Sequence, residues 1–210
     1  ILKSIIEAYR KIRNTIRWML GVLSNYDQSW IYDYEDLDEL EKYMLHSLTR
    51  LQKDVLDAYE AYDYRKVTTL LVNYINLDLS AFYFDIRKDS LYCDPYSSEK
   101  RKSSLYVINI IFKTISKLYA PILSFTMDEV WKNYPFAQDR SIHLTRFELV
   151  NDKWSNDNIN SKWDNVRKLR KTVTAALEVK RRDKEIGSSL EAGIQIYLND
   201  EDIMASVSDI

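Results

Sequence analysis

The chain has 210 residues, 46% of them hydrophobic, which is enough for a sizeable core and excludes wholesale disorder. A formal net charge of −2 argues against a general nucleic-acid binder, and a single cysteine excludes a disulfide framework. With only three glycines and three prolines, the composition favours long helices over a turn-rich all-β fold.

Residues 3–23 have the periodicity of an amphipathic helix. One face is apolar and is expected to lie in the core: Ile5, Ile12, Ile16, Met19 and Leu23. The opposite face is mostly basic and carries Lys3, Arg10, Arg13, Asn14 and Arg17. Trp18 borders this basic face. The connector that follows, residues 26–41, carries seven carboxylates and no basic residue, which is typical of a solvated acidic segment.

Three further helices are expected before residue 120. Asp36, with Glu39 three residues later, is a candidate N-cap for a helix that ends at a break near Tyr62 and Asp63. A more apolar helix spans residues 65–86, and Cys93-Asp94-Pro95 is a turn signal. Ser97 or Ser98 then opens a helix that ends near Ala120.

The segment APILSFTMDEVW, residues 120–131, predicts a sharp corner between two helices. Pro121 cannot continue a helix without losing a backbone hydrogen bond. Thr126 and Glu129 have capping-box spacing, and Phe125 and Val130 stand at the positions of a hydrophobic staple. We expect Phe125 and Trp131 to anchor this corner in the core, and we interpret it as structural rather than as a ligand site.

The remaining chain suggests a second unit. Residues 141–148 are expected to be extended, a polar linker at 150–160 marks a boundary, and a helix spans residues 161–185 with Gly187 as its C-terminal cap. Residues 190–198 alternate as a β-strand does, and one strand cannot stand alone. We therefore predict a helical domain over 1–150 and the beginning of a second domain over 151–210. The chain starts without methionine, and we expect it to be part of a larger protein.

Catalytic and metal-binding patterns are missing from the sequence. The scattered glycines form no phosphate-binding or dinucleotide-binding motif. His46 and His143 have no partners at metal-ligand spacing, and Cys93 is expected to be a small buried apolar residue rather than a nucleophile. No apolar run approaches the ~20 residues of a membrane span, and no signal-peptide pattern opens the chain, so we expect a soluble cytoplasmic protein with no membrane partner.

Positive charge is concentrated in two helices. Residues 1–23 carry five basic residues and one acidic residue, and residues 162–184 carry nine basic and three acidic residues. In the second helix five basic side chains fall roughly opposite the apolar stripe: Arg167, Arg170, Lys171, Arg181 and Arg182. Such faces suit the phosphates of folded RNA, and the alternative of an ordinary solvated face stays open.

Several segments, in the expected order, resemble isoleucyl-tRNA synthetases, which are class I aminoacyl-tRNA ligases. AYRKIRNTIRWMLGVL (8–23) is similar to the helix that opens the anticodon-binding bundle, and APILSFTMDEVW (120–131) to a corner shared by the class I enzymes for Ile, Val, Leu and Met. NLDLSAFYFDIRKDSLYCD (76–94) resembles the isoleucine enzymes in particular. SIHLTRF (141–147) and KEIGSSLEAGIQIYL (184–198) add weaker likenesses, the latter to the start of a junction domain.

The resemblance implies a mainly α fold: an antiparallel helix bundle that binds the anticodon stem and loop, followed by the start of a small α+β junction domain. It implies a parent enzyme, monomeric, that joins isoleucine to its tRNA with ATP and Mg²⁺. The ATP-binding signatures, the editing domain and the C-terminal zinc module of many members are all absent from these residues. Glu41 also stands where the family usually shows an aspartate.

We therefore expect this chain to hold tRNA for isoleucine, without catalytic, cofactor-binding or metal-binding residues of its own. Arg10, Arg13, Asn14 and Arg17 would contact phosphates and 2′-hydroxyls, and Trp18 would either stack on an unpaired base or, as we favour, pack beneath Arg17. Two alternatives are the anticodon-binding domain of a valine enzyme and a helical module that docks protein through its acidic connector.

Overall fold

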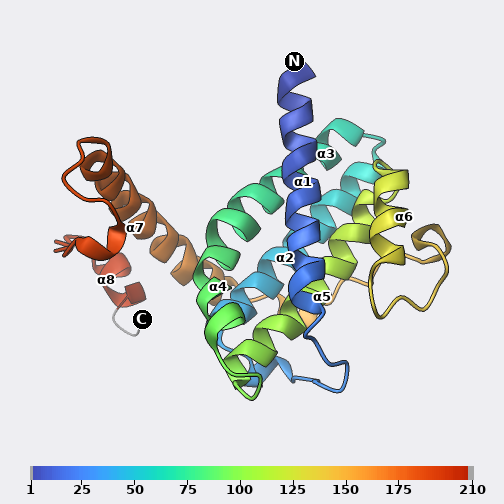
Figure 1. Cartoon of the computed structure of the whole chain (residues 1–210), viewed down its shortest axis with the longest axis horizontal. Coiled ribbons are helices and arrows are strands. Elements are labelled where there is room, and N and C mark those ends of the chain that lie inside the picture. Colours follow the sequence, from blue (N-terminus) through green and yellow to red (C-terminus); the bar gives the residue numbers. More distant parts are fainter. Residues whose placement is uncertain (1, 208–210) are drawn as a thin grey trace. The chain divides into compact units, whose positions relative to one another are not determined.

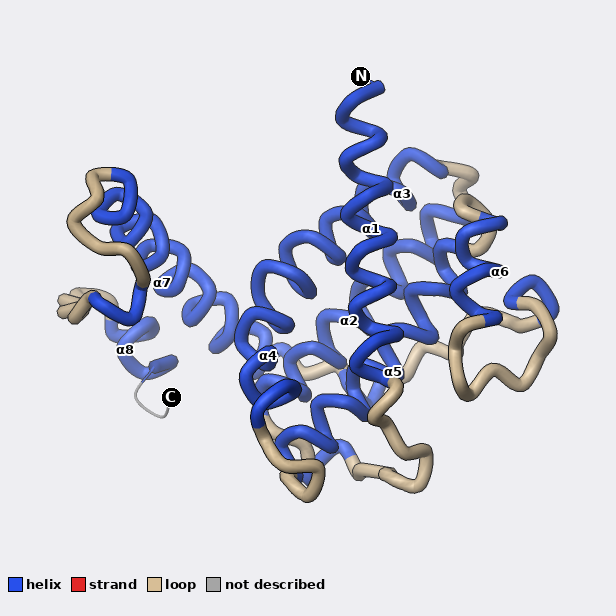
Figure 2. Tube along the Cα trace, in the orientation of Figure 1, coloured by secondary structure: helices blue, strands red, loops and turns tan. Residues whose placement is uncertain are grey.

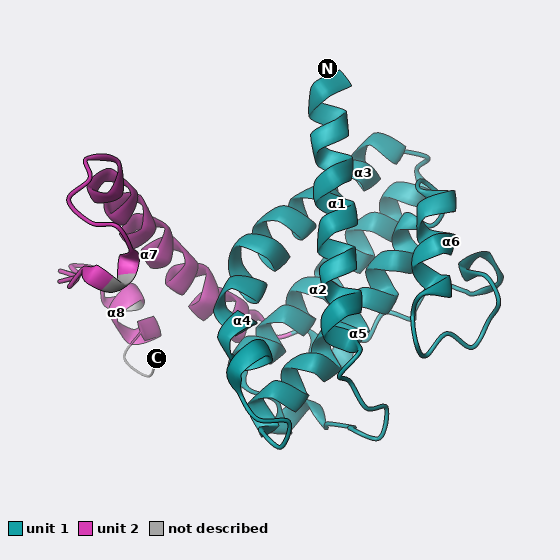
Figure 3. Cartoon of the chain, in the orientation of Figure 1, with its two compact units in different colours: residues 1–155 teal, residues 156–210 magenta. Residues whose placement is uncertain are grey.

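The computed structural model describes residues 2–207, which form two compact units, residues 1–155 and 156–210 (Figure 3). The longer helices of the first unit are α1 (Leu2–Leu23), α2 (Glu39–Glu60), α3 (Tyr64–Asn73), α4 (Phe84–Cys93), α5 (Glu99–Tyr119) and α6 (Ser124–Lys132) (Figure 1). Short 3-10 turns lie at Tyr34–Asp36, Ile142–Leu144 and Asp152–Trp154. The second unit contains α7 (Asp157–Arg182), a 3-10 turn at Ser189–Glu191 and α8 (Glu201–Val207).

Helix α5 is the centre of the first unit, because it packs against α1, α2, α4 and α6. It is buried over most of its circumference, and its apolar side chains Ile108, Ile111, Phe112 and Ile115 are fully buried. Burying one such side chain stabilises the fold by about 1.5–3 kcal/mol. The predicted mainly α bundle is confirmed, and over the described residues Figure 2 contains only helices and loops.

A π-helical segment, Tyr74–Tyr83, joins α3 to α4 without a break. The predicted helix over 65–86 is therefore longer than expected and continues to the turn at Cys93. Val67, Leu71, Ile75, Leu79 and Tyr83 are fully buried along this element. The segment also contacts α1, where the hydroxyls of Ser80 and Thr15 are 3.0 Å apart.

Two of the helix starts predicted before residue 120 are correct and one is not. Ser98 caps α5, where its hydroxyl accepts from the amide of Arg101, and the break near Tyr62 precedes α3, which Asp63 caps. Asp36 instead lies in a 3-10 turn, and α2 begins at Glu39 after Asp38.

The corner at Pro121 forms, but not through a capping box. Helix α5 ends at Tyr119, and α6 begins at Ser124, so Thr126 lies inside α6 and its hydroxyl is 3.1 Å from that of Tyr9 instead. Phe125 is 94% exposed, so the predicted staple and core anchor are wrong at this residue. Trp131 is buried, as predicted.

The C-terminal predictions fail in two places. Helix α7 ends at Arg182, and the left-handed residue after it is Lys184 (φ 60°) rather than Gly187. The amides of Lys184 and Glu185 donate back to the carbonyls of Arg181 and Lys180, which closes the helix before the glycine is reached.

The strand predicted over 190–198 is wrong, because this segment forms part of a 3-10 turn and then an irregular stretch. A strand needs a hydrogen-bonded neighbour, and the described part of the chain supplies none. Residues 141–148, which were expected to be a short extended piece, contain a 3-10 turn at Ile142–Leu144 and then continue without regular structure.

Candidate nucleic-acid interface

The polar face of α1 is exposed because its opposite face enters the bundle. Ile12, Ile16, Met19 and Leu23 are buried, whereas Ile5, which the periodicity assigned to the core, is 59% exposed. The residues predicted for the polar face all lie on the exposed side of the helix, four of them basic together with Asn14: Lys3, Arg10, Arg13, Asn14 and Arg17.

The arginines of α1 differ in their partners. Arg10 pairs with Glu7 of the same helix at 2.9 Å, and Arg13 reaches Glu129 of α6 at 3.4 Å. Arg17 forms no ion pair with any residue that the structure describes. Exposed pairs contribute little to stability and open readily, so the phosphates of an RNA could compete for Arg10 and Arg13.

A hollow of about 680 Å³, here called the α1 hollow, lies beside the C-terminal half of α1. Its lining is drawn from three helices and the turn before α5: Asn14, Arg17, Trp18, Gly21, Val22, Asn25, Leu91, Tyr92, Tyr96 and Arg101. The lining thus contains two arginines and no carboxylate. The structure brings three of the predicted residues (Asn14, Arg17 and Trp18) into this one place.

Trp18 is fixed within the wall of the α1 hollow. Its ring lies on Phe84 with centroids 4.2 Å apart, and its indole Nε1 donates to the hydroxyl of Tyr92 at 2.6 Å. Half-buried and held on two sides, the indole packs against α4 rather than extending as a free platform. The aromatic surface that faces solvent here is that of Tyr92, which is 63% exposed.

Seven lining residues of the α1 hollow were not predicted from the sequence, and the exposed tyrosines and the second arginine are among them: Tyr92, Tyr96 and Arg101. Tyr92, Tyr96 and Arg101 lie 69 to 78 residues after the end of α1 at Leu23, and only the packing of the helices brings them to it. Tyr96 is 65% exposed and lies against the guanidinium of Arg101, whose Cζ is 4.3 Å from the ring centroid. Tyrosines either side of a turn, followed by a basic helix start, were the signal that could have been noticed.

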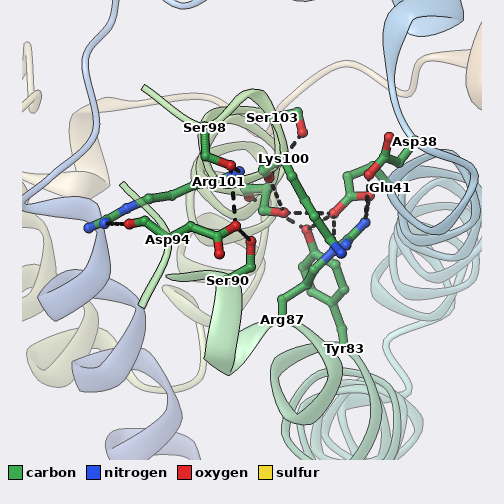
Figure 4. Close-up of polar contacts among 11 residues, drawn as sticks. Asp38, Glu41, Tyr83, Arg87, Ser90, Asp94, Ser98, Lys100, Arg101 and Ser103 are labelled. Atoms are coloured by element: carbon green, nitrogen blue, oxygen red, sulfur yellow. Dashed lines mark hydrogen bonds and ion pairs between the residues drawn. The ribbon is translucent and has the colours of Figure 1, made fainter. Parts of the chain in front are cut away.

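A buried polar cluster holds α4 in position. Glu41 of α2 is fully buried, and its carboxylate accepts from Arg87 Nε at 2.8 Å, from Tyr83 at 3.0 Å and from Ser104 at 2.9 Å (Figure 4). Arg87 Nη2 donates to the same carboxylate and to Asp38 at 3.1 Å. The cluster ties α2, α4 and α5 together, and Lys88 and Tyr92 lie on the same helix as Arg87.

Burial and charge set the pKa values within this cluster. Burial is the largest single effect and opposes the charged guanidinium of Arg87, but the hydrogen bonds to Glu41 together with the charges around the guanidinium outweigh it and raise the pKa of Arg87. Burial, followed by the nearby Glu41 charge, raises the pKa of Tyr83 well above its ordinary value. The arginine therefore stays charged and the tyrosine stays neutral.

The residues of α7 that were predicted to bind RNA belong to the second unit, and their surroundings are those of that unit alone. Arg167 and Arg170 are half-buried, whereas Lys171, Arg181 and Arg182 are exposed. Arg181 pairs with Glu178, and Arg182 lies 3.5 Å from Asp183. The apolar stripe opposite is at most half-buried at Val166, Leu169, Val173 and Leu177, with Ala176 exposed.

The residues considered for other chemistry do not form a site. His46 is buried, and His143 Nε2 lies 3.2 Å from the Ser124 carbonyl oxygen. Cys93 is exposed, contrary to expectation, because the helix that it ends turns it to solvent. Over residues 2–207 no group of three or more His, Cys, Asp or Glu could hold a metal ion, and no helix is long and apolar enough to cross a membrane.

Comparisons with known proteins fit this geometry. Residues 41–198 match the family described as the anticodon-binding domain of tRNA ligase. The chain is 49% identical to the isoleucine–tRNA ligase of Agrobacterium fabrum over 99% of its length, and 48% identical to that of Bradyrhizobium diazoefficiens over its whole length. The isoleucine–tRNA ligase of Brucella abortus is 46% identical, also over the whole chain. The chain spans 21% of the length of each of these relatives.

Proposed function

Because the chain belongs to the family of anticodon-binding domains of tRNA ligases, we propose that it is the tRNA-binding region of an isoleucine–tRNA ligase. The observation that supports this most directly is the α1 hollow, in which two arginines and two exposed tyrosines meet without a carboxylate. Arginine binds phosphate in a bidentate manner, and tyrosine rings stack on unpaired bases.

In this proposal the face of α1 lies along the anticodon stem. Arg10, Arg13 and Arg17 follow one another at three- and four-residue steps, so they occupy one side of the helix over about 10 Å. Phosphate contacts of this kind set the position of an RNA, and contacts to bases select it. The basic side of α7, with Arg167, Arg170, Lys171, Arg181 and Arg182, would add a second contact surface.

The whole ligase would join isoleucine to its tRNA with ATP and Mg²⁺, in a cytoplasmic and monomeric enzyme. Catalysis and editing would take place in domains outside these 210 residues, and zinc would belong to a C-terminal module outside them. The residues of this chain would only hold the tRNA. The names of the relatives support isoleucine over valine, and no observation favours a protein-docking module.

The test is fluorescence anisotropy of the 210-residue chain with an isoleucine tRNA transcript at two salt concentrations. A transcript with a swapped anticodon reports whether bases are read. We expect Arg17→Glu to weaken binding at least tenfold and to lower the salt slope by about 0.7–0.9, because one phosphate contact is lost. Arg65→Glu, the same charge reversal at an exposed residue of α3, is the matched control.

Three outcomes are decisive. Binding that weakens on Arg17→Glu and on the anticodon swap supports anticodon reading by this chain. Binding that ignores the swap but follows Arg17 supports a stem-gripping role. Failure to bind at high micromolar protein in low salt, or equal losses for the Arg17 and Arg65 variants, overturns the proposal.

A further inference from the structure

Arg101 is an unusual arginine because it is buried without a direct ion pair to any carboxylate of the described residues. The residue is 7% exposed, yet it forms no ion pair with the residues that the structure describes. Its Nη1 donates to the main-chain carbonyl of Asp94 at 2.6 Å, and its Nε has no hydrogen-bond partner. A buried charge normally has a counter-charge, since an isolated one is costly.

The neighbouring carboxylate is already engaged elsewhere. The side chain of Asp94 accepts from the hydroxyls of Ser90 at 2.5 Å and Ser98 at 3.2 Å (Figure 4). In the same view Arg101 extends away from Arg87 and the buried cluster of Glu41. The two buried arginines of this region thus differ: Arg87 forms ion pairs with two carboxylates, whereas Arg101 forms none with the described residues, although its charge helps to lower the pKa of Asp94 after the hydrogen bond from Ser90.

A ligand in the α1 hollow would give Arg101 the direct ion pair that it lacks among the described residues. Arg101 lines this hollow together with Arg17, which also forms no ion pair with described residues, and the amides of Asn14 and Asn25 line it too. The volume of about 680 Å³ falls within the ~300–1,000 Å³ of small-molecule sites and has room for a nucleotide unit. Guanidinium groups bind phosphate oxygens through paired N–H donors.

We propose that the α1 hollow is a phosphate site, in which Arg101 and Arg17 together hold one phosphodiester of the bound RNA. This assignment rests on the proposed function, and it adds a residue, Arg101, and a ligand chemistry to it. A phosphodiester, unlike free inorganic phosphate, also brings a nucleoside to the exposed rings of Tyr92 and Tyr96. The ring of Tyr96 lies against the Arg101 guanidinium, and this cation–π contact helps to hold the guanidinium beside the hollow.

The experiment scans single neutral methylphosphonates through the anticodon stem and loop of the isoleucine tRNA. Binding to the 210-residue chain is measured by anisotropy for the unchanged protein, Arg101→Gln and Arg17→Gln. Lys102→Gln is the matched control, because it removes one positive charge from the next residue of the same helix, where Lys102 pairs with Glu99. A parallel titration measures binding of inorganic phosphate alone at constant ionic strength.

We expect one position at which replacing the phosphate by a methylphosphonate weakens tRNA binding by the unchanged chain about tenfold. The same replacement should have little effect on tRNA binding by either arginine variant. Each arginine variant should also lower the salt slope by about 0.7–0.9, and Lys102→Gln should not. Arg17 is exposed, so its variant keeps the test valid even where Arg101→Gln disturbs folding.

Other outcomes separate this inference from the proposed function. If the chain binds tRNA but the effect of no methylphosphonate position depends on Arg101 or Arg17, the phosphate site is overturned and the proposed function stands. Millimolar binding of inorganic phosphate that depends on Arg101, with tRNA affinity indifferent to Arg101, would assign the hollow to a free anion and overturn the RNA ligand. A complete lack of tRNA binding by the unchanged chain would overturn both proposals.

Discussion

At the residue scale, Glu41 shows how one side chain can connect three helices. Its carboxylate is fully buried and receives hydrogen bonds from Arg87, Tyr83 and Ser104. The family that this chain resembles usually has an aspartate here, and the structure shows that the longer glutamate still places a carboxylate opposite Arg87. A buried pair of this kind is a weak source of net stability, but breaking it leaves a buried charge without a partner.

We predict that Glu41→Gln lowers the free energy of unfolding by about 3–5 kcal/mol, because Arg87 would keep its charge with only Asp38 beside it. Urea unfolding followed by circular dichroism measures the change. Glu35→Gln is the control, since the Glu35 side chain is 87% exposed, and it should stay within about 0.5 kcal/mol of the unchanged chain. Equal midpoints for the two variants would contradict the role of Glu41.

Tyr62 is a second informative residue, because it adopts a backbone conformation that glycine usually occupies. It follows α2 with a left-handed backbone (φ 55°), and the amides of Tyr62 and Asp63 donate to the carbonyls of Tyr59 and Ala58. This is the hydrogen-bond pattern of a helix end at which glycine is the usual residue. Tyr62 is 78% exposed, so its ring contributes little packing.

Tyr62→Gly should therefore raise the free energy of unfolding by about 1 kcal/mol, because glycine adopts the left-handed conformation without strain. Tyr62→Ala removes the same ring but keeps the strained backbone, so it should give no such gain. Thermal unfolding of both variants compares them directly. A melting temperature of the glycine variant at or below that of the alanine variant would refute the strain argument.

At the scale of elements, the corner between α5 and α6 separates what sequence can predict from what it cannot. Pro121 ends α5 through local chemistry alone, so the bend was predictable. Whether Phe125 or Trp131 enters the core depends on where α6 begins relative to the bundle; α6 begins three residues earlier than the predicted Thr126 cap implies, and the Phe125 side chain lies in solvent. Local sequence signals thus predict where a helix ends better than they predict which of its side chains are buried.

The same argument explains the candidate site. The basic face of α1 follows from its periodicity, and all of its predicted residues lie on the exposed side. Tyr92, Tyr96 and Arg101 could not be joined to that face, because the contact arises from packing between α1, α4 and α5. The strand expected at 190–198 failed for a related reason, since alternation alone does not provide a pairing partner.

The two aromatic residues of α6 should respond very differently to truncation. Trp131→Ala is expected to cost about 3–5 kcal/mol, because it removes a buried ring in contact with Tyr134. Phe125→Ala should change stability by less than about 0.5 kcal/mol, because the Phe125 ring is 94% exposed. Chemical unfolding of both variants tests the contrast, and similar losses would mean that Phe125 is packed in solution.

At the scale of the whole molecule, many of the partly or fully buried side chains in the bundle around α5 are tyrosines. Burial, as the main cause, raises the pKa of seven of them: Tyr26, Tyr32, Tyr59, Tyr83, Tyr106, Tyr119 and Tyr134. Tyr59 donates to the Leu118 carbonyl at 2.6 Å, and burial raises the pKa of Tyr59 to about 12. Folding therefore favours the neutral phenol.

The consequence is a loss of stability in alkali. A phenol whose pKa is higher in the folded chain contributes its full stability below the unfolded value of about 10, and loses it as the pH rises toward the folded pKa. We expect a melting temperature that is nearly constant from pH 7 to about 9.5 and falls steeply above pH 10. Thermal scans across this range, with tyrosinate absorbance as a second signal, test it. A constant melting temperature up to pH 11.5 would contradict the prediction.

The π-helical segment between α3 and α4 also leaves a trace in the sequence. Buried residues recur at every fourth position along this element: Val67, Leu71, Ile75, Leu79, Tyr83, Arg87 and Leu91. In an unbroken α-helix a repeat of four advances by about 40° at each step, so the stripe would wind around to the solvent side. The wider turn of the π segment winds it back. In this long helix, burial at every fourth residue is thus the sequence signature of the π-helical segment. The π-helical segment keeps Val67 and Leu91 on the same buried side of the helix.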